Sequence, residues 1–217
     1  MGTITEGFSN LTDVMLADFG ASVPGVKRAN LSHILLSRLL KPILPAAVRC
    51  GPGLIVDVKD RQVGPFDAVA ASDLYPAMGE GPASVYPVDG AIFVLQIRDW
   101  SASDLTEFNR LAKDLKQLER KGRPPVFCAA VSFEALALEQ VMELLQSQAG
   151  QSIDGIMTLN QHAVLRNSQG WYGNPEQVPF VSERSAPEAL KSFAFLLLHL
   201  SHSFLGRPFG LADYQHL

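Results

Sequence analysis

Cysteine is scarce in this sequence, which holds only Cys50 and Cys128 in 217 residues. The two lie far apart and lack the spacing of a metal site or of a disulfide-rich secreted domain. We interpret both as reduced thiols in the core of a cytosolic protein. A basic segment followed by an apolar run is also missing near the N-terminus, so the sequence predicts a cytoplasmic protein without a secretory signal.

Positive charge and long apolar runs are lacking as well. The chain has 18 Lys and Arg against 22 Asp and Glu, which gives a formal net charge of -4. Proteins that mainly bind nucleic acid usually carry a basic face, so this balance argues against nucleic acid as the partner. The apolar run FAFLLLHLSHSFL is too short to span a bilayer and is interrupted by His199, Ser201 and His202, so no membrane association is predicted.

Several common catalytic motifs are absent. The sequence contains no Gly-rich phosphate loop, no nucleophile elbow and no cluster of Cys and His with metal spacing. His199 and His202 are three residues apart on an apolar helix without a third ligand in view, and we interpret them as core or helix-edge residues. These absences exclude several enzyme classes and direct attention to the strands.

The stretch from Gly53 to Arg98 organises the chain. Its three short apolar runs, punctuated by Gly, Pro and Asp, predict strands over Leu54–Val58, Asp67–Ala71 and Ala91–Ile97. The last strand ends in Gln96 and Arg98. Residues two apart project to the same face of a strand, so both side chains should share the face that carries Val94.

The flanking segments predict helices and further strands. An amphipathic pattern from Val26 to Leu44 predicts a helix, and a short helix precedes it over Leu11–Phe19. A helix over about 104–121 should begin at Ser101 or Ser103 and end at Gly122. The remaining predicted elements are a strand in VFCAAVSF, a helix over about 134–148, strands in GIMTLN and HAVLRN, and a helix over Ala186–Leu205.

This order predicts a single α/β domain with a mixed central β-sheet flanked by helices. Within it we distinguish an N-terminal extension (1–25), a core (26–165), and a loop with a C-terminal helix (166–217).

Five short segments of this core resemble the PD-(D/E)XK nuclease superfamily, and most closely a group of uncharacterised bacterial domains within it. The segments are Ile43-Leu44-Pro45, Gly53-Leu54-Ile55-Val56-Asp57, Phe66-Asp67-Ala68-Val69, Tyr86-Pro87-Val88 and Leu95-Gln96-Ile97-Arg98. The resemblance covers roughly residues 26–165 and implies a restriction-endonuclease-like core.

The resemblance also implies a metal-dependent site, in which a strand Asp and the Glu of a Glu-x-Lys motif hold divalent ions and the Lys orients water. Asp67 matches the metal-binding Asp. Gln96 stands where Glu is expected and is a neutral, weaker ligand, while Arg98 stands where Lys is expected and cannot act as a base. The predicted helix from Val26 to Leu44 contains no carboxylate. We therefore expect a vestigial site with no catalytic residue and no cofactor.

Two alternatives remain open at this site. The chain could be a divergent nuclease that uses Asp67, Gln96 and Arg98 with Mg²⁺. Structurally, Asp67 could instead pair with Arg98, and Gln96 could be a hydrogen-bonded amide at the end of its strand.

The acidic balance and the degenerate site together predict a protein-binding role. The concrete hypothesis is an immunity protein that neutralises a basic nuclease toxin, such as one delivered by a type VI secretion system, because an acidic surface is steered to a positive groove. Trp171 and Tyr172 are candidate partner-binding residues, unless they anchor their loop on the core. A nucleic-acid-binding module without cleavage is a weaker alternative. The sequence leaves the oligomeric state open, a dimer included.

Overall fold

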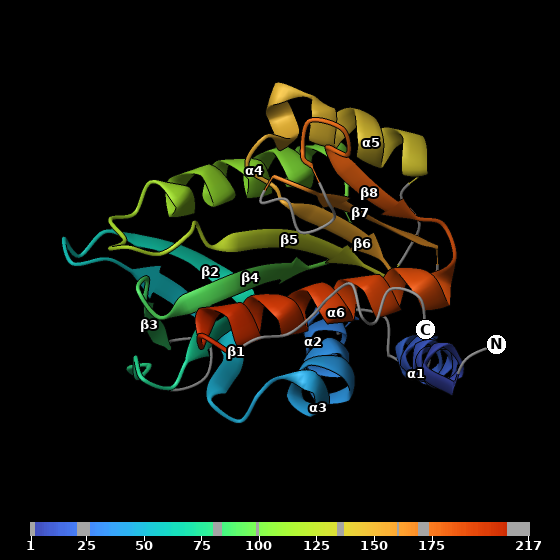
Figure 1. The fold of residues 1–217 in the computed structure, drawn as a ribbon, viewed down its shortest axis with the longest axis horizontal. Helices are drawn as coiled ribbons and strands as arrows, with labels where there is room; N and C mark the ends of the chain where they lie inside the picture. Colours follow the sequence, from blue (N-terminus) through green and yellow to red (C-terminus); the bar gives the residue numbers. More distant parts are fainter. Residues whose placement is uncertain are drawn as a thin grey trace.

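An eight-stranded sheet in the order β3-β1-β2-β4-β5-β6-β7-β8 forms the centre of the protein (Figure 1). The computed structural model describes residues 3–20, 27–79, 84–98, 100–133, 137–159, 161–168 and 174–207. Helices cover both faces of the sheet. The predicted mixed sheet flanked by helices is therefore confirmed.

The strand directions divide the sheet into three parts. The strands are β1 (Val48–Val56), β2 (Gln62–Ser72), β3 (Val85–Pro87), β4 (Ala91–Ile97), β5 (Phe127–Ser132), β6 (Gly155–Thr158), β7 (His162–Arg166) and β8 (Phe180–Glu183). Strands β1, β2 and β4 form an antiparallel meander, with β3 parallel to β1. Strands β4, β5 and β6 are parallel, and β7 and β8 follow antiparallel. The carboxyl ends of β4, β5 and β6 therefore lie together at one end of the sheet, and their amino ends lie together at the opposite end.

The sequence missed two strands and misplaced the ends of two others, because β1 begins at Val48 and not at Leu54, and β2 begins at Gln62 and not at Asp67. β3 and β8 are only three and four residues long, too short for alternation to show. The first predicted strand extended to Val58, but β1 ends at Val56 and Val58 lies in an exposed turn. The strands predicted in VFCAAVSF, GIMTLN and HAVLRN are confirmed as β5, β6 and β7.

Two groups of helices cover the sheet. α1 (Thr3–Gly20), α2 (Lys27–Ile34) and α6 (Ala186–Phe204) lie on one face, and α4 (Ala102–Lys116) and α5 (Leu138–Gln146) lie on the other (Figure 1). α2 continues through a π-helical turn, Leu35–Leu40, into α3 (Lys41–Ile43), so the helix predicted from Val26 to Leu44 is confirmed in its described part. Each face has its own hydrophobic core.

Helix α4 is shorter than predicted. Ser101 caps it through a capping box with Asp104, as expected, but the helix ends at Lys116 and not near residue 121. Backbone N–H groups beyond that point bond to side chains of other elements: Glu119 N donates to Asp57 (3.0 Å) and Lys121 N donates to Asp89 (3.0 Å). These tertiary bonds replace helical ones, so Gly122 is not the helix cap.

Cys50 and Cys128 are both free thiols, as predicted. Burial raises the pKa of both, and Cys128 is fully buried. Burial therefore disfavours the thiolate form of both side chains. In the described part of the chain, no helix is long and apolar enough to cross a membrane.

Asp57 is the turn residue that ties the β1–β2 connection to the end of α4. Its carboxylate accepts from Lys59 N (2.9 Å), from Arg61 N and Nε (3.1 and 2.8 Å) and from Glu119 N. Burial alone would raise the pKa of Asp57, but the bonds from Glu119 and Arg61 outweigh it and hold this pKa below the ordinary 3.8. A lowered folded-state pKa stabilises the protein above pH 3.8, and this stabilisation is lost as the pH falls through the lowered value.

The Asp57→Asn variant is therefore expected to melt at a lower temperature than the wild type at pH 7. The difference should shrink as the pH is lowered from about 4 toward 2, because the wild-type carboxylate then protonates. Thermal unfolding across this pH series measures it. Asp60→Asn, at an exposed position of the same turn, is the matched control, and an equal pH-dependent loss in both variants would contradict the assignment.

Candidate functional site

The residues predicted from the nuclease resemblance come together on adjacent strands. Strands β2 and β4 are antiparallel with Ala68 opposite Leu95, which places Asp67 beside Gln96 one step further along. Val94 belongs to the core under α4 and α5, and strand alternation brings Gln96 to the same face. The predicted grouping is thus found, at the carboxyl end of β4.

Asp67 and Arg98 both have partners that the sequence did not identify. The Asp67 carboxylate accepts a hydrogen bond from Ile97 N at 2.7 Å, which ties it to the end of β4. The Arg98 guanidinium lies 3.8 Å from the Asp104 carboxylate and stacks 5.1 Å from the centre of the Trp100 ring. Arg98 is therefore held by the first turn of α4.

Gln96 differs from the hydrogen-bonded amide considered as an alternative. Its side chain is 1% exposed, and its Oε1 atom has no hydrogen-bond partner. Three other buried polar atoms near this end of the sheet also lack a partner: Arg98 Nε, Thr158 Oγ1 and His162 Nε2. Thr158 lies opposite His162 across β6 and β7. The sequence did not predict that Thr158 and His162 belong to this site. A polar threonine at the end of the apolar strand in GIMTLN is the signal that could have indicated it.

This donor set does not fit a pair of divalent cations. Hard cations bind best to several charged oxygens. Here Asp67 offers one carboxylate, Gln96 offers a neutral amide oxygen, and Arg98 brings a fixed positive charge. Among the described residues, no three His, Cys, Asp or Glu side chains gather where they could hold a metal ion.

Gln96 provides a stability test of this site. Replacing it with methionine, which has a similar shape, removes a buried amide whose oxygen is unbonded. An unsatisfied buried group costs about 1–3 kcal/mol, so Gln96→Met should raise the free energy of unfolding by about 1 kcal/mol, measured by urea denaturation. Gln140→Met, at an exposed position on α5, should change it by less than about 0.5 kcal/mol. A loss of stability in Gln96→Met would show that the amide is satisfied in solution.

The candidate partner-binding residues Trp171 and Tyr172 lie outside the described residues. In the described structure, neither His33 nor the pair His199 and His202 belongs to a group of side chains that could hold a metal ion. His33 is exposed on α2, whereas His199 and His202 lie half-buried along α6.

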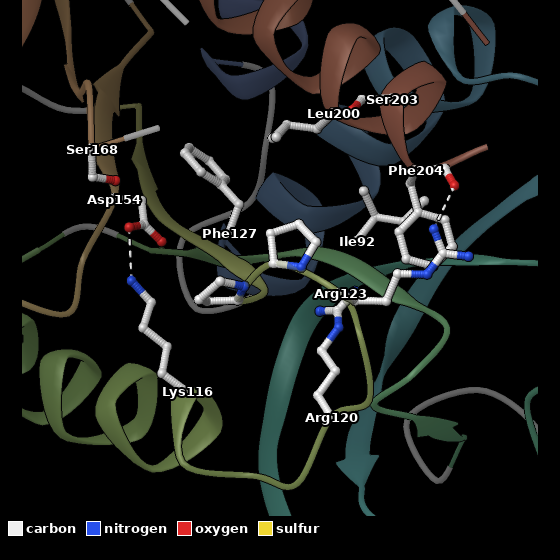
Figure 2. Close-up of a pocket in the computed structure, with 12 residues that line it drawn as sticks. Ile92, Lys116, Arg120, Arg123, Phe127, Asp154, Ser168, Leu200, Ser203 and Phe204 are labelled. Carbon is white, nitrogen blue, oxygen red and sulfur yellow. Dashed lines mark hydrogen bonds and ion pairs between the residues drawn. The ribbon is translucent and has the colours of Figure 1, made fainter. Parts of the chain in front are cut away.

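A second site, which the sequence did not predict, lies at the opposite end of the sheet. A cavity of about 340 Å³ opens at the amino ends of β4, β5 and β6 (Figure 2). α4 starts at the carboxyl end of β4 and returns along it, so its last residues reach this cavity together with the end of α6. The lining residues are Ile92, Lys116, Arg120, Arg123, Pro124, Pro125, Phe127, Asp154, Ser168, Leu200, Ser203 and Phe204.

Two arginines form the basic end of this cavity. Arg120 Nη2 donates to the Ala91 carbonyl at 2.6 Å, while its Nε and Nη1 are buried without a partner. Arg123 donates to the Phe204 carbonyl at 3.2 Å, and its guanidinium lies 4.4 Å from the centre of the Phe204 phenyl ring. Burial lowers the pKa of Arg120 to about 10, so it remains positively charged at neutral pH. Donors without acceptors beside a second guanidinium are suited to an anion.

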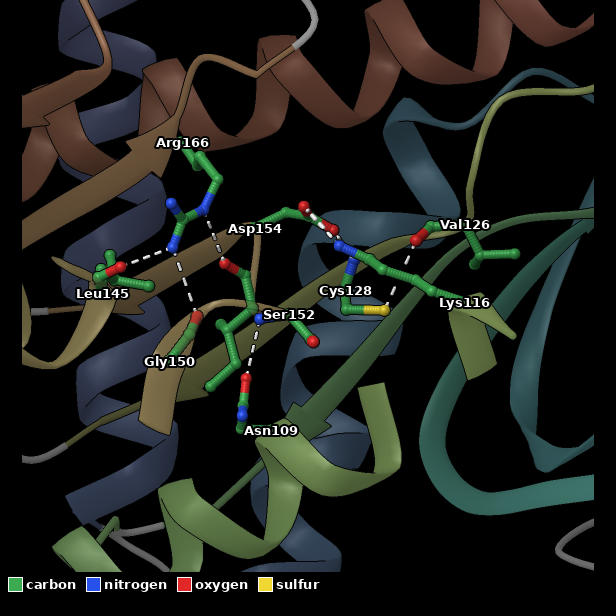
Figure 3. Close-up of polar contacts among 10 residues, drawn as sticks. Asn109, Lys116, Val126, Cys128, Leu145, Gly150, Ser152, Asp154 and Arg166 are labelled. Carbon is green, nitrogen blue, oxygen red and sulfur yellow. Dashed lines mark hydrogen bonds and ion pairs between the residues drawn. The ribbon is translucent and has the colours of Figure 1, made fainter. Parts of the chain in front are cut away.

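An ion pair forms the other end of the cavity (Figure 2). Asp154, just before β6, accepts from Lys116 Nζ (2.7 Å) through one carboxylate oxygen and from Cys128 N (2.8 Å) through the other. Burial raises the pKa of Asp154, against the lowering effects of Lys116, Cys128 N and Arg166. Figure 3 shows how the surrounding segment is fixed: Arg166 donates to the carbonyls of Leu145, Gly150 and Ile153.

The predicted nuclease-like α/β fold is confirmed by its likeness to solved structures. No protein-family model and no curated protein matches the sequence. Solved structures of the nuclease NucC are similar. NucC of E. coli MS115-1 in its cAAA-bound form has a TM-score of 0.76 and 15% identity, over 94% of this chain and 92% of that chain. NucC of P. aeruginosa ATCC27853 in its cAAA-bound form has a TM-score of 0.74 and 12% identity, over 95% of this chain and 100% of that chain. The apo form of the E. coli protein has a TM-score of 0.70 and 15% identity, over 93% of each chain.

Proposed function

We propose that this chain is a binding protein built on a nuclease fold, and that it takes a phosphate-bearing ligand in the cavity between Arg120 and Asp154 without cleaving nucleic acid by a metal-dependent route. The observation that carries the proposal is the pair Arg120 and Arg123, whose side chains line one end of the cavity; two buried nitrogen atoms of Arg120 have no acceptor. Burying such donors is costly unless an acceptor arrives.

Two further observations support this proposal. The nuclease-like site offers one carboxylate, one amide and one guanidinium, which is a poor set of ligands for Mg²⁺. Two of the similar NucC structures are cAAA-bound forms, so a fold of this kind accommodates such a ligand. The net charge of -4 does not oppose an anionic ligand, because the basic end of the cavity is local.

Calorimetric titration with cAAA, AMP and inorganic phosphate tests the binding. We expect at least one nucleotide to bind with an affinity that falls as salt rises; failure of all three probes to bind would overturn the proposal. A parallel incubation with DNA and RNA in Mg²⁺ or Mn²⁺ should show no cleavage. Cleavage that disappears in Asp67→Ala would instead support the alternative of a divergent Mg²⁺-dependent nuclease that uses Asp67, Gln96 and Arg98.

A protein partner is our second proposal, favoured by the net charge of -4 and the degenerate site. An immunity protein that neutralises a basic nuclease toxin fits both features through electrostatic steering. Co-purification with toxins encoded beside its gene, at low and high salt, tests this role. A stable complex that blocks the toxin's nuclease activity would support it, and the absence of any complex at low salt would rule it out.

A further inference from the structure

The two ends of the cavity differ in charge, and this difference points to the shape of its ligand. We infer that Asp154 is a specificity-determining residue, which selects a ligand carrying an amino group at the end opposite its phosphate. This inference rests on the proposed function. The class of ligand it names is a nucleotide whose base bears an exocyclic amino group.

The carboxylate of Asp154 keeps capacity for a ligand. Its side chain is 11% exposed and lines the cavity. Each carboxylate oxygen offers two lone pairs, and each already accepts one bond, from Lys116 Nζ and from Cys128 N. Each oxygen can therefore accept one more donor. Lys116 and Cys128 also fix the carboxylate in place, so a ligand need not order it on binding.

The middle of the cavity favours a flat, apolar group. Phe127, Pro124, Pro125 and Leu200 line the cavity, and Figure 2 shows Phe127 and Leu200 among its walls. Binding pockets of this kind take affinity from apolar walls and orientation from a few polar groups. With its phosphate at the arginines and its ring in this apolar middle, the ligand would direct the far edge of the ring toward Asp154 at the other end of the cavity.

The carboxylate discriminates by the type of group that it faces. It is an acceptor only, so an amino group forms a charge-assisted hydrogen bond with it. A ligand with a carbonyl oxygen at this position would be repelled by the negative carboxylate. A ligand with only a hydrogen atom there would form no hydrogen bond with it. The exposed Ser168 lies at this end too (Figure 2), but a hydroxyl both donates and accepts and so does not discriminate.

Calorimetric titration with AMP and with purine riboside 5′-monophosphate, which is the same nucleotide without the amino group, tests the inference on the wild-type protein. AMP should bind about tenfold more tightly, since a hydrogen bond to a charged group contributes about 1.5–3 kcal/mol. In Asp154→Asn the ratio of the two dissociation constants should approach about one. In Asp114→Asn, an α4 carboxylate outside the cavity that pairs with Arg110, the ratio should be unchanged.

The outcomes separate the two proposals. Equal binding of both nucleotides to the wild type would overturn the role of Asp154 and leave phosphate binding in place. Failure of both nucleotides to bind, together with cAAA and phosphate, would overturn the proposed function itself and this inference with it. Because the comparison of two ligands needs only the wild-type chain, the test holds even if Asp154→Asn does not fold.

Discussion

Replacing Arg120 with methionine should weaken nucleotide binding by about a hundredfold. Each charge-assisted bond to a phosphate contributes about 1.5–3 kcal/mol, and Arg120 lines the cavity beside Arg123. Methionine keeps much of the apolar stem and removes the charge and the donors of the guanidinium, which lies 5.7 Å from the centre of the Phe204 ring. Calorimetric titration with AMP or cAAA measures the change.

The matched control for this variant is Arg110→Met. Arg110 lies on α4, is exposed and pairs with Asp114, so its loss should change affinity by less than about twofold. Arg120 also donates to the Ala91 carbonyl, and thermal unfolding therefore accompanies the titration. A folded Arg120→Met protein that binds with wild-type affinity would contradict a phosphate site at this end of the cavity.

The sequence predicted the sheet and the nuclease-like positions for a physical reason. β4 is buried along its whole length, so its apolar run stands out, and Gln96 and Arg98 mark its end. Asp67 likewise marks the polar start of the apolar run in β2. Strand alternation then brings such residues together without further information, because register is set by the buried face.

The cavity could not be predicted in the same way. Arg120 and Arg123 lie after α4, in a stretch that is typical of a charged helix end. Their neighbour Phe204, and Asp154 at the other end of the cavity, are distant from them in sequence. Their meeting depends on where α4 stops, and that point is set by bonds from Glu119 N to Asp57 and from Lys121 N to Asp89. Local propensity does not contain these tertiary bonds, so it extended the helix to residue 121.

The proposal that Asp67, Gln96 and Arg98 do not support metal-dependent cleavage can be tested by restoring the expected residues. The double substitution Gln96→Glu with Arg98→Lys adds a carboxylate next to Asp67 and replaces the fixed guanidinium with an amine that also occurs in metal-dependent nuclease sites of this fold. We expect Mn²⁺ to bind at least about tenfold more tightly than to the wild type, because cation affinity rises with the number of charged oxygen ligands.

Titration of the double variant with Mn²⁺, followed by calorimetry, measures this gain. Adding Asp67→Asn as a third substitution should abolish it, because the metal then loses one of its two carboxylates. A folded double variant that binds Mn²⁺ no better than the wild type would show that the bond from Ile97 N holds the Asp67 carboxylate away from a shared cation. The defect would then lie in the position of Asp67 and not only in the identities of Gln96 and Arg98.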